Sequence, residues 1–139
     1  MSKVAVIYWS GTGNTEAMAK SIEKGLKEKS AETDVFEVSS APASLDGYDK
    51  IAFGCPSMGA EVLEESAFEP YFTSVEKSLK DKKVALFGSY GWGDGQWMRD
   101  WAERARSAQA VLVDDGFIQH ETPNADECEE FGKKFADFQ

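Results

Sequence analysis

The sequence predicts a single α/β domain over residues 1–139, in which helices cover both faces of a five-stranded parallel sheet. Short apolar runs alternate five times with segments whose apolar residues recur at helical spacing. This alternation is typical of parallel strands joined by right-handed crossovers. The first run, KVAVIY at Lys3–Tyr8, is rich in β-branched residues and has no polar face, which indicates a strand buried on both sides.

The rest of the chain continues this alternation. From Asn14 to Lys29, apolar residues at intervals of four define the buried face of a helix; these are Met18, Ile22 and Leu26. Further strands are expected at Thr33–Ser39, Lys50–Cys55 and Val84–Phe87, with a fifth at Val111–Val113 and Phe117–Gln119 interrupted by Asp114, Asp115 and Gly116. Further helices are expected at Ala67–Leu79, Trp97–Ala108 and Ala125–Phe138, and a connection with one helical turn at Ser40–Tyr48. The last helix carries a stripe expected to be core: Cys128, Phe131, Phe135 and Phe138.

Charge and composition limit the classes of partner and the location. A formal net charge of −10 argues against nucleic acid and anionic membranes, because both attract cationic surfaces. Taken alone, the acidity favours simple solubility over docking to a basic protein. There is no signal peptide and no apolar run of the ~20 residues that cross a membrane. Cys55 and Cys128 lack metal-ligand or CxxC spacing, so reduced thiols in a cytoplasmic protein are favoured over a single disulfide.

The Gly-rich turn WSGTGNT, at Trp9–Thr15, predicts a site for a phosphate group. Its glycines expose backbone N–H groups, and the following helix adds the positive end of its dipole. Neutral donor side chains are supplied by Ser10, Thr12, Asn14 and Thr15. The alternative is an ordinary turn with a capping residue. No Lys follows as in a nucleotide-hydrolysing P-loop, and Glu16 replaces the third glycine of a dinucleotide motif, so a monophosphate that is held and not cleaved is expected.

Two more loops leave the carboxyl ends of predicted strands, where open parallel sheets bind their ligands. In Pro56–Glu61, Met58 is flexible and polarisable, and Glu61 can accept hydrogen bonds from a ring edge. In Ser89–Gly95, Trp92 stands between two glycines, as expected of a stacking platform or an interface anchor. With the phosphate turn, these loops predict a planar, phosphorylated ligand.

These three motifs resemble flavodoxins, specifically the short-chain type of clostridia and related anaerobes. The resemblance rests on WSGTGNTE at Trp9–Glu16, MGAE at Met58–Glu61 and LFGSYGWGDG at Leu86–Gly95, and it extends over essentially the whole chain. It implies a flavodoxin-like doubly wound sheet in the order 2-1-3-4-5 and one non-covalently bound FMN. The residues it assigns to the cofactor are Ser10, Gly11, Thr12, Gly13, Asn14, Thr15, Met58, Gly59, Ala60, Glu61, Ser89, Tyr90, Gly91, Trp92 and Gly93.

The resemblance also implies roles for these residues. The first loop would hold the FMN phosphate, Met58 and Trp92 would flank the ring, and Glu61 would bind flavin N3. Gly59 would present its carbonyl to N5–H after one-electron reduction, through a flip of the Gly59–Ala60 peptide.

Two positions depart from the family. Pro56 stands where some relatives have a hydroxyl residue, and Ala60 tolerates positive φ less well than Gly.

The function implied by the resemblance is low-potential one-electron transfer between semiquinone and hydroquinone states, without substrate turnover. The partners expected are larger oxidoreductases with basic docking faces, bound transiently by a cytoplasmic monomer that binds no nucleic acid and inserts in no membrane. The alternatives are an FMN-dependent quinone or NAD(P)H oxidoreductase, and a non-redox flavin-binding module. His120 is expected to be a solvated loop residue without a catalytic role.

Overall fold

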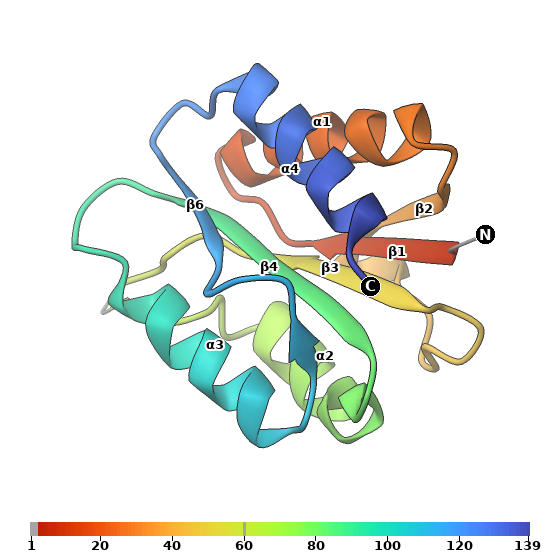
Figure 1. Cartoon of the computed structure of the whole chain (residues 1–139). Coiled ribbons are helices and arrows are strands. Elements are labelled where there is room, and N and C mark those ends of the chain that lie inside the picture. Colours follow the sequence, from red (N-terminus) through yellow and green to blue (C-terminus); the bar gives the residue numbers. More distant parts are fainter. Residues whose placement is uncertain (1–2, 60) are drawn as a thin grey trace.

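Parallel strands form one sheet in the computed structural model, which describes residues 3–59 and 61–139 (Figure 1). Their order is β2-β1-β3-β4-β5, and β6 also pairs with β4, which confirms the predicted order 2-1-3-4-5. The strands are β1 (Lys3–Tyr8), β2 (Glu32–Glu37), β3 (Lys50–Gly54), β4 (Lys83–Tyr90), β5 (Val111–Leu112) and β6 (Phe117–His120).

The predicted fifth strand is interrupted where the sequence indicated. Its first piece, β5, pairs with the start of β4, and its second piece, β6, pairs with the end of β4 from Phe87 to Tyr90. Between them, an Asp114 carboxylate oxygen accepts a hydrogen bond from the Gly116 N–H at 2.9 Å, which closes a local turn. The strand β4 is therefore longer than expected, because its last residues pair with β6.

Four α-helices cover the sheet, two on each face (Figure 1). They are α1 (Asn14–Glu28), α2 (Phe68–Val75), α3 (Gln96–Ser107) and α4 (Ala125–Asp137). The segment predicted as one helix to Leu79 ends in a tighter 3₁₀ turn, Glu76–Leu79. The helical turn expected within Ser40–Tyr48 lies slightly earlier, at Val38–Ser40, where the Glu37 carboxylate accepts a hydrogen bond from Ser39 N–H at 3.2 Å.

The sheet separates two hydrophobic cores. One packs α2 and α3 against it and contains Trp97, Trp101 and Cys55; the other packs α1 and α4 and contains Cys128. Since the two thiols lie on opposite faces of the sheet, they cannot form a disulfide with each other. Burial raises the pKa of the Cys55 thiol to about 12 and that of the Cys128 thiol to about 11, so both are poor nucleophiles.

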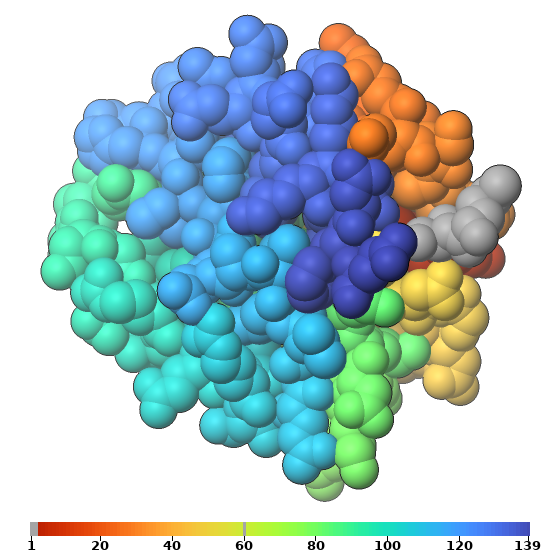
Figure 2. All heavy atoms as spheres, in the orientation of Figure 1, coloured from red at the N-terminus to blue at the C-terminus, as the bar shows by residue number. Residues whose placement is uncertain are grey.

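The helices α1 and α4 approach each other closely because each has a glycine at the contact. A Cβ on Gly25 would overlap the carbonyl oxygen of Glu129, and one on Gly132 would overlap that of Ile22. In Figure 2 the orange atoms of α1 and the dark blue atoms of α4 lie directly against each other. This contact fixes the position of α1, whose first two residues are the last two of the Gly-rich turn.

Replacing Gly25 by Ala tests the close contact. Alanine favours a helix over glycine by about 1 kcal/mol, but its Cβ would push against a backbone oxygen that cannot move alone, at a cost of about 1–3 kcal/mol. We expect Gly25→Ala to lower the free energy of unfolding in urea, whereas Lys20→Ala, exposed on the same helix, should change it by less than about 0.5 kcal/mol. A Gly25→Ala protein more stable than the parent would contradict this packing.

Candidate cofactor site

Three loops at the carboxyl edge of the sheet enclose a cavity of about 290 Å³. This edge is the left-hand side of Figure 1, where the connections leave β1, β3 and β4. The cavity therefore lies where parallel sheets place their ligands. Its lining residues are Trp9, Gly11, Thr12, Asn14, Pro56, Ser57, Met58, Ser89, Tyr90, Gly91 and Glu121.

The first loop brings the start of α1 to this cavity. Gly13 precedes the helix with φ of 97°, and none of the described side chains caps the helix by a hydrogen bond. The Ser10 hydroxyl oxygen accepts a hydrogen bond from Gly13 N–H at 3.0 Å, which holds the turn and leaves the Ser10 O–H free to donate. The N–H groups and the positive end of the helix dipole are thus available to an anion.

Thr15 lies beneath the cavity and does not line it. Its hydroxyl and that of Ser89 are both buried and lie 3.1 Å apart in a hydrogen bond. Since each hydroxyl has one hydrogen, one of the pair donates to the other and the second keeps its hydrogen for another acceptor. The pair also joins the start of α1 to the end of β4.

The electrostatics of the cavity are unusual for an anion site. Of the described residues that line it, none is Lys or Arg, and Glu121 carries a formal charge. Glu16, in the first turn of α1, accepts a hydrogen bond from the Tyr8 hydroxyl at 3.1 Å. Burial, and secondarily this bond, raises the pKa of Tyr8, so the phenol remains a neutral donor. Any anion here is held by dipoles and hydroxyl groups.

The second loop forms a narrow turn between β3 and α2. Met58 and Val62 pair through two backbone hydrogen bonds of 2.9 and 3.0 Å, and Gly59 and Glu61 have positive φ values of 44° and 57°. Ala60, predicted to contribute to the site, lies outside the described residues. Buried Glu64 anchors the end of this loop, because its carboxylate accepts hydrogen bonds from the N–H groups of Ser66 and Ala67.

The third loop lies against the second through Glu61. A Glu61 carboxylate oxygen accepts a hydrogen bond from Asp94 N–H at 3.2 Å, and a Cβ on Gly93 would overlap the same carboxylate. Asp94 in turn pairs with Arg99 at 3.0 Å, so its charge is partly compensated. Trp92 is 63% exposed, with its ring outside the core, as the sequence predicted.

The structure brings together part of the predicted set in the cavity wall: Gly11, Thr12, Asn14, Met58, Ser89, Tyr90 and Gly91. Gly59, Glu61, Trp92 and Gly93 lie in the two adjoining loops. The residues that sequence reasoning missed are Trp9, Pro56, Ser57 and Glu121. Glu121 follows the carboxyl end of β6, and the rule that ligands lie at strand ends could have indicated it. His120, expected in a loop, ends strand β6, and its Nε2 lies 3.3 Å from the Gly91 carbonyl oxygen.

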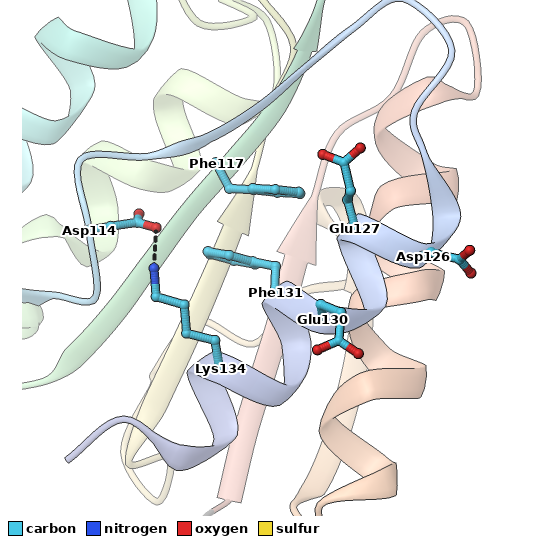
Figure 3. A pocket seen from close by; sticks show the side chains of 7 residues that line it. All are labelled: Asp114, Phe117, Asp126, Glu127, Glu130, Phe131 and Lys134. Carbon is cyan, nitrogen blue, oxygen red and sulfur yellow. Dashed lines mark hydrogen bonds and ion pairs between the residues drawn. The ribbon is translucent and has the colours of Figure 1, made fainter.

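A larger hollow of about 570 Å³ lies between α4 and the segment before β6 (Figure 3). Its floor is the stacked pair Phe117 and Phe131, whose ring centroids are 4.5 Å apart. Four carboxylates line it, and its one lysine, Lys134, is paired with Asp114 at 3.2 Å. Because these carboxylates repel anions, this hollow does not suit a phosphorylated ligand.

Comparisons with known proteins agree with this arrangement. The family model described as Flavodoxin matches residues 6–132. A flavodoxin of Megasphaera elsdenii is 46% identical over 136 residues, covering 96% of this chain and 98% of that protein. A flavodoxin of Clostridium beijerinckii is 48% identical over 134 residues, covering 94% and 97%. The solution structure of two-electron reduced Megasphaera elsdenii flavodoxin superposes with a TM-score of 0.88 and 42% identity, covering 97% of this chain and 99% of that one.

The Glu64 carboxylate offers a test of how the second loop is anchored. We expect Glu64→Gln to lower the free energy of unfolding by about 1–3 kcal/mol, because an amide NH₂ would face backbone N–H groups that now bind carboxylate oxygens. The matched control is Glu65→Gln, which removes the same charge from an exposed neighbouring residue. Equal urea midpoints for both variants would show that the Glu64 contacts do not anchor the loop.

Proposed function

The chain belongs to the flavodoxin family, and we propose that it carries single electrons at low potential between larger oxidoreductases. It is an FMN-binding electron carrier and not an enzyme with a substrate of its own. The cavity supports this role, because it offers a phosphate site without a cation beside an exposed tryptophan. Its place at the carboxyl edge follows the switch-point rule for open α/β sheets, of which flavodoxins are themselves an example.

The residues present fit FMN. The uncapped start of α1 offers N–H groups to a phosphate, Met58 lines the cavity, and the exposed Trp92 follows Gly91, which also lines it. When bound, FMN supplies reversible electron uptake at its isoalloxazine ring, and the protein supplies binding, orientation and electrostatics. We propose that the whole chain, as one domain, serves this single site.

The phosphate is proposed to lie at the first loop. Thr12 and Asn14 line the cavity there, and Ser10 can donate its hydroxyl hydrogen because its oxygen already accepts from Gly13 N–H. The Thr15–Ser89 pair retains one further hydrogen to donate. The backbone N–H groups of Gly11, Thr12, Asn14 and Thr15 and the helix dipole complete a set of neutral donors that can satisfy a phosphate dianion.

The ring is proposed to lie against the second and third loops. Met58 and Trp92 would pack on its two faces, and backbone groups of Ser89, Tyr90, Gly91 and Gly93 would face its edge. Glu61 has one carboxylate oxygen bound to Asp94 N–H, which leaves the other oxygen to accept from flavin N3. The Gly59 carbonyl is proposed to accept a hydrogen bond from the N5–H group that the ring carries once reduced, a bond worth about 0.5–1.5 kcal/mol.

A low potential is expected from the charges around the cavity. Negative charge gained by the ring on full reduction would lie near Glu61 and Glu121, and the described residues of the cavity wall include no cation. Like charge and poor solvation disfavour the added electron. Every tenfold decrease in the equilibrium constant for adding one electron lowers that one-electron potential by about 59 mV.

The acidic surface supports transient docking to basic faces of oxidoreductases by a monomeric, cytoplasmic carrier. The formal net charge of −10 favours attraction at long range and fast release. Within residues 3–59 and 61–139, no helix combines the length and apolar character needed to span a membrane. An NAD(P)H or quinone oxidoreductase is not favoured, because a second nucleotide would need a basic clamp that the described lining residues lack.

A positive charge added to the phosphate loop tests the electrostatic tuning. We expect Thr12→Lys to raise the more negative of the two one-electron potentials by about 30–60 mV, because an added cation near the cavity favours the added electron. Ser107→Lys, exposed at the end of α3, adds the same charge far from the site and serves as the control. Equal potentials in the two variants, measured by potentiometry, would refute the tuning.

Docking is tested by the effect of salt on electron transfer to a basic acceptor such as ferric cytochrome c. We expect the second-order rate constant to fall several-fold between about 0.01 and 0.15 M ionic strength, because salt screens the attraction between the two proteins. A rate constant independent of ionic strength would contradict docking by charge. Rapid oxidation of NADH by the FMN-loaded protein alone would instead support the oxidoreductase alternative.

A further inference from the structure

The single histidine of the chain contacts a residue that lines the proposed cofactor cavity. His120 ends strand β6, opposite Tyr90 in the register with β4, and the two rings are 5.0 Å apart. Its Nε2 lies 3.3 Å from the carbonyl oxygen of Gly91, a residue that lines the cavity. The next residue, Glu121, also lines the cavity, and its N–H donates to the Tyr90 carbonyl at 2.8 Å.

His120 contacts the first residue of the Gly91–Gly95 loop, and other side chains bind the loop near its end. The Gly91–Gly95 segment is rich in glycine, which makes its ordering costly in backbone entropy. Glu61 and Arg99 bind Asp94 at the far end of the segment. His120 contacts the start of the segment at the Gly91 carbonyl, and Trp92 is the next residue.

The strength of this contact depends on the protonation of the ring. A neutral imidazole can donate to the Gly91 oxygen in one of its two tautomers, whereas an imidazolium always donates and forms a stronger, charge-assisted bond. A Glu121 carboxylate oxygen lies 3.6 Å from the same nitrogen and forms an ion pair with the ring when the ring is protonated. Since the His120 side chain is 55% exposed, the gain is limited by solvent and amounts to a few-fold in an equilibrium constant.

The other charged and titratable groups near His120 come from three elements packed around it. From β4, the Tyr90 ring packs against the imidazole. From the third loop, Asp94 is paired with Arg99. From α4, Glu127 accepts a hydrogen bond from the Gln119 side chain at 3.5 Å, one residue before His120. The charged groups nearest His120 that have no cationic partner named here are thus the carboxylates of Glu121 and Glu127.

We propose that His120 is a positioning residue whose protonation fixes the Gly91 carbonyl and thereby strengthens the binding of FMN. The inference rests on the proposed FMN site. A wall that is already ordered reduces the entropy cost of binding the ring, so proton and cofactor binding are coupled. By linkage, the coupling is reciprocal: bound FMN must favour the protonated ring by the same factor.

The first experiment compares the pH dependence of FMN affinity in the unmodified protein and in His120→Asn. The dissociation constant is measured by quenching of flavin fluorescence from pH 5.5 to pH 8. The FMN phosphate titrates near pH 6 by itself, but it does so equally with both proteins and cancels in their ratio. We expect the unmodified protein to lose about fivefold more affinity than His120→Asn on going from pH 5.5 to pH 8. Thr122→Ala, an exposed neighbour, should behave as the unmodified protein.

The second experiment needs no variant. Because the chain has one histidine, its imidazole proton resonances in the NMR spectrum belong to His120. We expect the titration midpoint of these resonances to be higher with FMN bound than without it, by about 0.7 pH unit for a fivefold coupling. Equal midpoints, or parallel pH profiles of affinity in the protein and in His120→Asn, would overturn the inference while leaving the FMN site intact. Failure to bind FMN at any pH would instead overturn the proposed function.

Discussion

The proposed function depends on a phosphate held by dipoles in place of a cation. The start of α1 supplies uncapped N–H groups and the positive end of the helix dipole, while Ser10, Thr12 and Asn14 supply neutral donors. A lysine here would bind phosphate more strongly, but its charge would also stabilise electrons added to the neighbouring ring. The position of α1 therefore has consequences for both affinity and potential, and the glycine contact between α1 and α4 helps to fix that position.

Three carboxylates near the cavity have defined polar neighbours. Glu16 binds the Tyr8 hydroxyl, Glu61 binds Asp94 N–H, and Glu121 lies beside His120. Negative charge is thus placed at defined points around the site. Such charges disfavour further electrons on the ring and remain available to attract a basic partner. One arrangement of acidic side chains can therefore contribute to both the potential and the docking.

The fold could be predicted almost completely from the sequence, because buried parallel strands such as Lys3–Tyr8 and helix stripes such as Met18, Ile22 and Leu26 differ clearly in period. The lining of the cavity could be predicted where motifs leave the carboxyl ends of strands. The positions of His120 and Glu121 could not, since they depend on how β6 pairs with β4 after the turn at Asp114. The burial of Thr15 against Ser89 was equally hidden, because it joins residues 74 positions apart.

A potentiometric titration of the FMN-loaded protein, followed by visible absorption, tests the separation of electron steps most directly. The charges around the cavity and a hydrogen bond accepted by the Gly59 carbonyl should act differently on the first and the second electron. We expect two resolved one-electron steps, the second at a clearly more negative potential than the first. A single two-electron step would mean that the protein does not separate the two electrons, and it would contradict the role of a one-electron carrier.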